Sequence, residues 1–154
     1  MDVTLLDRAA SHLAAENSKC SAAGIRAVCA DALALPFRDE SFDVVSCNLF
    51  AHHLAPERFV IFLREGLRVS RTALLINDLI RHPVHLALVY ASFPVMGSRV
   101  AWLDGLTSVR RAYTPEEMRA MIAGQALVPA CGKTEIFRRF LFRMGIIVWK
   151  DNLN

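Results

Sequence analysis

The chain has 154 residues, the size of one compact domain with a hydrophobic core, and 54% hydrophobic residues favour such a fold over disorder. Its 18 basic and 15 acidic residues give a net charge of +3 and are interspersed, so no nucleic-acid partner is expected. The one basic bias, at Arg138, Arg139, Arg143 and Lys150, is interpreted as a solvated strand face, with a weak anion-attracting patch as the alternative. We expect a single domain over residues 1–154.

The sequence shows neither a zinc-type cysteine pattern nor a targeting segment. The four cysteines include no CxxC pair, so we expect reduced thiols, no metal and a cytoplasmic location. The N-terminus lacks the basic and apolar regions of a secretory signal. The apolar run from Pro83 to Gly97 is shorter than the roughly 20 residues of a spanning helix, so we expect a buried or cap helix there and no membrane span.

Strand and helix patterns alternate along the first half of the chain, with β-prone runs separated by segments rich in helix formers. Gly24 ends the first helix, and Pro56 opens the second. In chain order we predict a strand over Val3–Asp7, a helix over Ala9–Ala23, a strand over Ile25–Asp31, a loop over Leu35–Ser41, a strand over Phe42–Asn48, a helix over Glu57–Val69 and a strand over Thr72–Asp78.

The second half is less regular. From Leu79 to Arg111 apolar and aromatic residues are interrupted by Pro and Gly. Thr114-Pro-Glu-Glu117 then predicts a helix start, with Thr as N-cap, Pro at the first position and Glu three residues after the cap. Closing strand material is predicted at Leu127–Cys131 and Phe140–Trp149. Because parallel strands need crossovers, the alternation predicts an α/β fold with helices on the faces of a parallel sheet.

Polar residues follow the ends of the predicted strands, and in an open parallel sheet this is the edge where ligands bind. Asp7, Asp31 and Asn48 follow three successive strands, and Asn77 and Asp78 end the fourth. We expect Asp7, Asp31 and Asn48 to converge at one rim.

The two acids suit a nucleotide. Asp7 is placed to accept hydrogen bonds from ribose hydroxyls, and Asp31 to accept from the adenine amine while the amide of Ala32 or Leu33 donates to a ring nitrogen. The alternative for each acid is a simple cap of the helix or turn that follows it.

The segment Cys29–Leu54 carries a Leu35-Pro-Phe turn, the run Asp39-Glu-Ser-Phe-Asp43 and then His52-His-Leu54. In this order these motifs resemble the class I S-adenosylmethionine-dependent methyltransferases of type 11, grouped with the ubiquinone and menaquinone biosynthesis enzymes. The resemblance implies a Rossmann-like, mostly parallel sheet with flanking helices, and a small apolar or aromatic substrate. It also implies cofactor-binding residues for S-adenosylmethionine: Asp7 and Arg8 at the ribose, Asp31, Ala32 and Leu33 at adenine, and Asn48 and Leu49 on the methionine side.

The resemblance begins at the second strand of the family, and the seven glycines form no GxGxG cluster. We therefore expect the first family strand and its glycine-rich loop to be missing. In the family sheet this strand is central and lies between the strands that begin here at Val3 and at Phe42. Either the native protein is longer, or the flanking strands pair directly and the pocket is incomplete. This chain alone is then expected to bind S-adenosylmethionine poorly or not at all, and its exposed strand edges favour a homo-oligomer.

Methyl transfer is mainly a matter of alignment, and a general base helps only where the acceptor is protonated. His53 is the best catalytic candidate, with His52 and His82 behind it, and a structural role is the alternative. His82, Tyr90 and Trp102 are assigned to the substrate side, Tyr90 and Trp102 with Phe93 as part of an apolar lid, with core packing as the alternative.

Two other functions are weighed against a methyltransferase. A noncatalytic remnant would serve as a partner-binding or regulatory subunit through its sheet edge. A nicotinamide-dependent reductase shares the acid after the second strand but leaves the Leu-Pro-Phe turn unexplained, and the chain has no Tyr-x-x-x-Lys pair.

Overall fold

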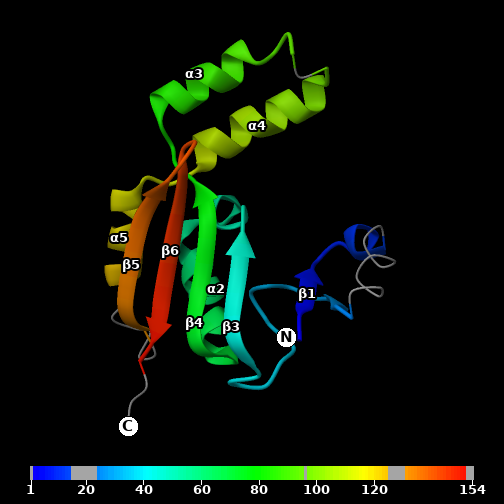
Figure 1. The fold of residues 1–154 in the computed structure, drawn as a ribbon, viewed down its shortest axis with the longest axis vertical. Helices are drawn as coiled ribbons and strands as arrows, with labels where there is room; N and C mark the ends of the chain where they lie inside the picture. Colours follow the sequence, from blue (N-terminus) through cyan, green and yellow to red (C-terminus); the bar gives the residue numbers. More distant parts are fainter. Residues whose placement is uncertain (1, 15–23, 96, 125–130, 152–154) are drawn as a thin grey trace.

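A computed structural model describes residues 2–14, 24–95, 97–124 and 131–151, which form a four-stranded and a two-stranded sheet with helices (Figure 1). This arrangement is the predicted α/β class. The elements are β1 (Thr4–Asp7), β2 (Arg26–Cys29), β3 (Phe42–Asn48), the 3-10 helix η1 (Ala51–His53), α2 (Pro56–Val69), β4 (Ser70–Leu79), α3 (Pro83–Ala91), α4 (Arg99–Arg111), α5 (Pro115–Ala123), β5 (Cys131–Arg139) and β6 (Arg143–Lys150).

The larger sheet has the order β3-β4-β6-β5, with a parallel ladder between β3 and β4 and antiparallel ladders elsewhere. Helices α2 and α5 pack on one face, where α2 buries its apolar stripe and α5 buries Met118 and Ile122. Both helix starts follow the prediction: Pro56 occupies the first turn of α2, and Thr114 and Glu117 form a reciprocal capping box on α5. The core of the chain lies between these helices and the sheet.

The smaller sheet consists of β1 and β2, which run parallel with Asp7 opposite Cys29. Residues 10–14 are helical after β1, and the remainder of the helix predicted over Ala9–Ala23 lies outside the described residues. Within the described part of the chain no ladder joins β1 to β3, so the direct pairing considered from sequence does not form. In the part of the chain that the structure describes, β1 and β3 each keep one edge without a strand partner.

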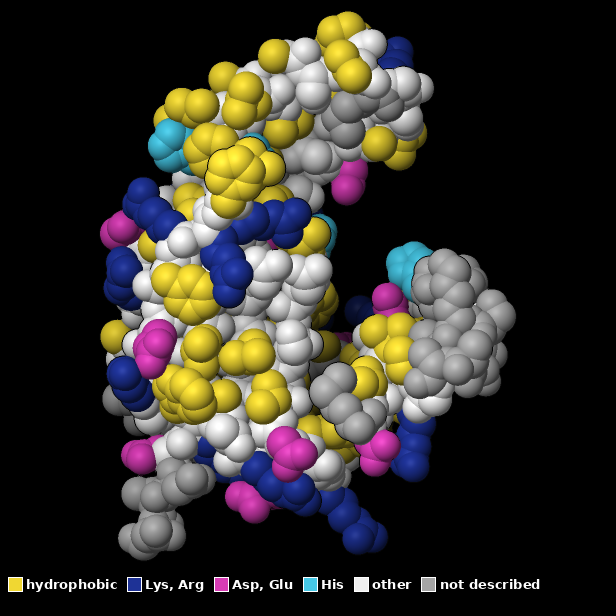
Figure 2. All heavy atoms as spheres, viewed as in Figure 1, with side chains coloured by type: hydrophobic (Ala, Val, Ile, Leu, Met, Phe, Trp, Pro, Cys, Tyr) yellow, Lys and Arg dark blue, Asp and Glu magenta, His cyan; other side chains and the backbone are white. Residues whose placement is uncertain are grey.

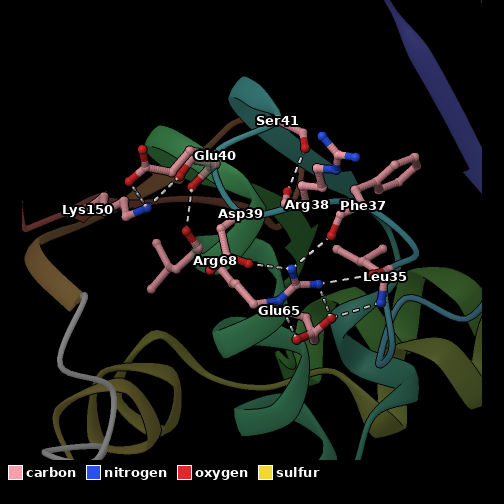
Figure 3. Close-up of polar contacts among 11 residues, drawn as sticks. Leu35, Phe37, Arg38, Asp39, Glu40, Ser41, Glu65, Arg68 and Lys150 are labelled. Atoms are coloured by element: carbon pink, nitrogen blue, oxygen red, sulfur yellow. Dashed lines mark hydrogen bonds and ion pairs between the residues drawn. The ribbon is translucent and has the colours of Figure 1, made fainter.

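The loop between β2 and β3 is fastened to α2 by Arg68 (Figure 3). The guanidinium of Arg68 donates to the carbonyl oxygens of Leu35 and Phe37 at 3.0 and 2.8 Å. It also forms two bonds with the carboxylate of Glu65, which in turn accepts from the Leu35 amide at 2.8 Å. Since Ala32 and Leu33 pack on the core of the larger sheet, this loop fixes the residues after β2 against α2.

Helices α3 and α4 project beyond the end of the larger sheet as an arm, defined here as residues 83–111 (Figure 1). An aromatic cluster joins them: Trp102 contacts the rings of Tyr90 and Phe93 edge-on and donates from Nε1 to the Val89 carbonyl oxygen. The run from Pro83 to Gly97 was expected to form a buried or cap helix. Helix α3 covers only Pro83–Ala91 and has no buried residue, so the expectation of a buried helix is wrong. None of the helices within the described residues is long and apolar enough to cross a membrane.

The C-terminal hairpin differs from the prediction. β5 was not predicted, Leu127–Ala130 lie outside the described residues, and Phe140–Phe142 form the turn before β6 instead of a strand. Arg139 and Arg143 are opposed across this turn, whereas Lys150 lies at the far end of β6 and binds Glu40 and the Ser70 carbonyl oxygen. The four basic residues grouped from sequence therefore do not form one patch.

Candidate cofactor and substrate site

The carboxyl ends of β1 and β3 point toward the same end of the molecule (Figure 1). At the end of β1, the Asp7 carboxylate accepts from the Ala9 amide at 2.7 Å and from His12 Nδ1 at 3.2 Å. The Ala9 hydrogen bond is the main cause that lowers the pKa of Asp7, which is therefore a carboxylate at neutral pH. Asp7 thus caps the turn after β1, and its part-exposed oxygens retain lone pairs for a ligand.

The loop after β2 places Asp31 beside the strand that pairs with β1, since the Ala30 amide donates to the Asp7 carbonyl oxygen. The Asp31 carboxylate accepts from the Leu33 amide at 2.9 Å. This hydrogen bond uses the Leu33 N–H, so of the two amides proposed to donate to an adenine ring, the Ala32 N–H is the one left to do so. Asp31 Oδ2 accepts from no other group in the described part of the chain.

Asn48 ends β3, and its Oδ1 accepts from Asn77 Nδ2 at 2.7 Å across the parallel ladder. The next residue, Leu49, adopts a φ of 54°, a left-handed conformation that is unusual for a branched side chain and ends the strand sharply. Its amide donates to the Asn77 carbonyl oxygen at 2.8 Å. Asn48 therefore presents an exposed side-chain amide at the strand end, while the Leu49 amide is already used.

Asn77 and Asp78 are neighbours on β4 and point to opposite faces of the sheet, as the two-residue period of a strand requires. Asn77 is exposed, whereas Asp78 is buried and accepts three hydrogen bonds, from the Leu79 amide, the His52 amide and His52 Nδ1. The His52 Nδ1 bond is 2.6 Å long. His52 is also buried. Among the described residues, its Nε2 is the one buried side-chain nitrogen or oxygen atom that has no hydrogen-bond partner.

Sequence reasoning placed His52 only behind His53 and missed its pairing with Asp78. The usable signal was the register of the parallel strands β3 and β4, which places Asn48 opposite Asn77. Asp78 follows Asn77, and the pair His52-His53 comes soon after Asn48, so the acid and the histidines lie at the same end of the sheet. Cys47 lies near the same acid, and burial followed by the charge of Asp78 raises the pKa of its thiol to about 12. Cys47 is therefore a neutral packing residue.

His53 is exposed at the end of η1, with its ring centroid 4.1 Å from that of His52. Burial of part of the ring, and then the neighbouring His52, lower the pKa of His53. A lowered pKa keeps the imidazole neutral at pH 7, the form that accepts a proton. Asp104 and Arg111 of α4 act on this pKa in opposite directions, which places His53 near the base of the arm.

The three residues assigned to the substrate side take different positions. His82 is the N-cap of α3, where Nδ1 accepts from the Val84 amide, and its ring stacks on Phe142. Tyr90 and Trp102 lie in the aromatic cluster of the arm, where Tyr90 also binds Arg110. Arg8, assigned to the ribose, is exposed beside Asp7, and its carbonyl oxygen accepts from Cys29 Sγ.

These donors and acceptors fit the adenosyl part of S-adenosylmethionine: Asp7 offers carboxylate oxygens for a diol, and Asp31 and Ala32 offer an acceptor beside a donor for adenine. For the methionine part of S-adenosylmethionine, the polar group at the end of β3 is the exposed side-chain amide of Asn48. Within the described ranges, no three His, Cys, Asp or Glu side chains are grouped so as to hold a metal ion.

Comparison with known proteins gives a family match over residues 1–73, just under half of the chain, to the methyltransferase domain. No curated protein matches. The fold is similar to that of a SAM-dependent methyltransferase from Aquifex aeolicus (TM-score 0.65, 14% identity, 96% of this chain and 68% of that one) and of another from Methanosarcina mazei (TM-score 0.64, 13% identity, 99% and 83%). It is also similar to that of the YcgJ protein from Bacillus subtilis (TM-score 0.59, 20% identity, 89% and 55%).

Structural likeness at these identities establishes the fold alone. The chain spans about half the length, 44–55%, of three solved structures with a similar fold, one of which is the YcgJ protein. The family match covers Asp7, Asp31 and Asn48, and the fold match extends over the rest. Residues 1–73 therefore match the model of the methyltransferase domain family, and the chain has a Rossmann-like fold similar to that of SAM-dependent methyltransferases.

Proposed function

We propose that this chain forms part of an S-adenosylmethionine-dependent methyltransferase that modifies a small apolar or aromatic molecule. The observation that carries the proposal is the pair of carboxylates at the ends of two adjacent parallel strands, Asp7 on β1 and Asp31 after β2, with the Ala32 amide beside them. Two acceptors and one donor at this spacing suit a ribose and an adenine ring together.

Each residue has one task in this proposal. When bound, S-adenosylmethionine supplies a methyl group on a positively charged sulfur. Asp7 accepts from the ribose hydroxyls, and Asp31 accepts from the adenine amine. His53 takes the proton that a hydroxyl or amine acceptor must lose, because its lowered pKa keeps it neutral at pH 7.

The first test is a titration of the chain with S-adenosylmethionine, followed by amide resonances in NMR spectra and by calorimetry. We expect the Ala32 amide to shift, with an affinity weaker than micromolar. Asp7→Asn and Asp31→Asn should each weaken binding about tenfold, because each removes a charge-assisted hydrogen bond to the ligand.

Asp43→Asn is the matched control, since Asp43 is the second residue of β3 and its exposed side chain pairs only with Arg71 in the described residues. This variant should bind like the original chain. An unchanged Ala32 resonance at saturating ligand would contradict the proposed adenine site. Micromolar affinity would contradict the expectation that this chain holds an incomplete pocket.

The unpaired edges of β1 and β3 favour a second candidate function, a noncatalytic subunit that takes up a strand from another chain. Among the described residues β3 pairs with β4 alone, and it exposes Val44, an apolar residue typical of strand pairing. A second copy of this chain is the simplest donor of a strand.

Light scattering after size-exclusion chromatography tests this candidate. If β3 pairs with another copy, the chain should elute as a dimer, and Val44→Lys should return it to a monomer because a charged edge residue opposes strand pairing. A monomer at all concentrations of the original chain would leave the methyltransferase proposal as the sole candidate.

A further inference from the structure

The arm presents apolar side chains to solvent on several sides. Helix α3 contains no charged residue other than the titratable His85, and none of its residues is buried. Val95 and Val100, in and after the link between α3 and α4, are 86% and 78% exposed. Further exposed apolar residues of the arm are Val84, Leu88, Phe93 and Leu103. Figure 2 shows apolar side chains over the arm. An apolar surface of this extent marks an interaction site.

The β5–β6 turn extends this surface from the body of the molecule. Phe140 is 87% exposed and Leu141 is 65% exposed. The turn lies at the base of the arm, because His82 and His85 stack on Phe142 with centroid distances of 5.1 and 4.9 Å. Leu141 and Phe142 adopt φ values of 56° and 57°, where Gly or Asn is the usual choice. Bulky apolar residues are therefore held in a strained, exposed turn.

Arginines surround this apolar end. The arm and the two residues before it, 81–111, contain four arginines and one aspartate. Their net charge equals the +3 of the whole chain. Arg139 and Arg143 add two more, directly opposed across the turn, an arrangement that repels in water. Within the described residues no carboxylate lies within ion-pair distance of Arg99, Arg111, Arg139 or Arg143. Figure 2 shows basic side chains gathered on the body below the arm.

We propose that the arm and the β5–β6 turn together dock on the surface of a bilayer that contains anionic lipid. Apolar side chains at the link and the turn enter the interface, and the surrounding arginines meet the lipid phosphates. Helix α3 is about 13 Å long at 1.5 Å per residue, well short of a hydrocarbon core of roughly 30 Å, so the arm lies in the interface of one leaflet and does not span the bilayer.

Charge favours lipid over a second copy of this chain. Helix α3 exposes one apolar face, since its other side packs on α4 and on Phe142, and arginines without a carboxylate partner among the described residues lie at the same end, a pattern typical of helices in an anionic bilayer interface. A second copy that docked through the same end would bring the unpaired arginines of both copies together, which a symmetric contact cannot avoid. The proposal goes beyond methyl transfer and does not depend on it.

Co-sedimentation with phosphatidylcholine vesicles, with and without phosphatidylglycerol, tests the proposal. We expect strong binding only to the vesicles that contain phosphatidylglycerol, decreasing as salt is raised. In a Trp149→Phe background, which leaves Trp102 as the sole tryptophan, binding should shift the fluorescence emission to shorter wavelength.

Val95→Glu combined with Phe140→Glu should lower vesicle affinity about tenfold or more, and Arg139→Gln and Arg143→Gln about fivefold each. Ile61→Glu is the matched control, because Ile61 is an exposed apolar residue of α2, away from this end, and should leave binding unchanged. The proposal is overturned if the chain ignores both vesicles, or if Ile61→Glu weakens binding as much as the double variant. Self-association that Val95→Glu abolishes would overturn it in favour of a second copy.

Discussion

Asp78→Ala is expected to lower the free energy of unfolding by about 3–5 kcal/mol, one of the two largest effects that we predict for a single substitution in this chain. The Asp78 carboxylate is buried and accepts from two backbone amides and from His52 Nδ1. Its removal leaves the buried amide and Nδ1 of His52, and the part-buried Leu79 amide, without this acceptor, and each unsatisfied buried donor costs about 1–3 kcal/mol. Urea unfolding followed by circular dichroism measures the change.

Two variants separate the hydrogen bonds of Asp78 from the loss of volume. Asp78→Asn keeps the shape and one acceptor oxygen, so it should destabilise less than Asp78→Ala. Asn77→Ala removes a polar side chain at the adjacent position on the exposed face, where its bond to Asn48 is open to water, and should cost less than about 1 kcal/mol. Equal effects of Asp78→Ala and Asn77→Ala would show that the buried pair does not hold the end of β4 to η1.

Elements whose local sequence and tertiary role agree were predictable. The helix opened by Pro56 and the capping box at Thr114 were both found where the sequence placed them, because cap chemistry acts within four residues. β3 has the predicted bounds because a β-prone run there follows a Pro-containing loop. A buried or cap helix was predicted over Pro83–Gly97, but its projection as an arm together with α4 was not, since α3 carries no apolar stripe that faces a core.

Long-range pairing decided what the sequence left open. β5 contains Lys133, Glu135, Arg138 and Arg139, and it is a strand because β6 provides a partner through a tight turn. The pairing of His52 with Asp78 joins residues 26 positions apart, and neither residue signals the other locally. The alternation of side chains along β4 predicts the face on which Asp78 lies. That Asp78 accepts a hydrogen bond from His52 could be seen only once the ladder between β3 and β4 was known.

Within the candidate site, the sequence indicated the residue types at the strand ends but not which hydrogen-bonding groups remained available. The caps proposed as alternatives for Asp7 and Asp31 are both present in the structure. They do not exclude a ligand, because a carboxylate accepts more than one hydrogen bond. They do remove the Leu33 amide from the set of donors, which a sequence alone does not reveal.

Arg68→Ala should lower the free energy of unfolding by about 2–4 kcal/mol and loosen the loop that leads from Asp31 to β3. The guanidinium donates to the carbonyl oxygens of Leu35 and Phe37 and to the carboxylates of Glu65 and Asp39 (Figure 3). Hydrogen exchange at the Leu33 and Leu35 amides should accelerate, since the loop loses its main link to α2. Urea unfolding and exchange measured by NMR check both effects.

Arg71→Ala is the control for the loss of an arginine. Its guanidinium binds Asp43 alone in the described residues, and both side chains are mostly exposed, so its loss should cost less than about 1 kcal/mol. The amides of Leu33 and Leu35 should exchange as in the original chain. If Arg68→Ala behaves like Arg71→Ala, the loop is held by the packing of Ala32 and Leu33, and the guanidinium is not its support.

The same contact predicts a dependence on pH. Hydrogen bonds from Arg68 are the main cause that lowers the pKa of Glu65 below its ordinary value of 4.5. A carboxyl group with a lower pKa in the folded state adds stability above its unfolded pKa, and this stability disappears as the pH falls through the folded pKa. The stability difference between the original chain and Arg68→Ala should therefore be full near neutral pH and narrow below pH 4.5 as Glu65 takes up a proton. Urea unfolding of both proteins across that range tests this, and a difference independent of pH would assign the role of Arg68 to the carbonyl oxygens of Leu35 and Phe37 alone.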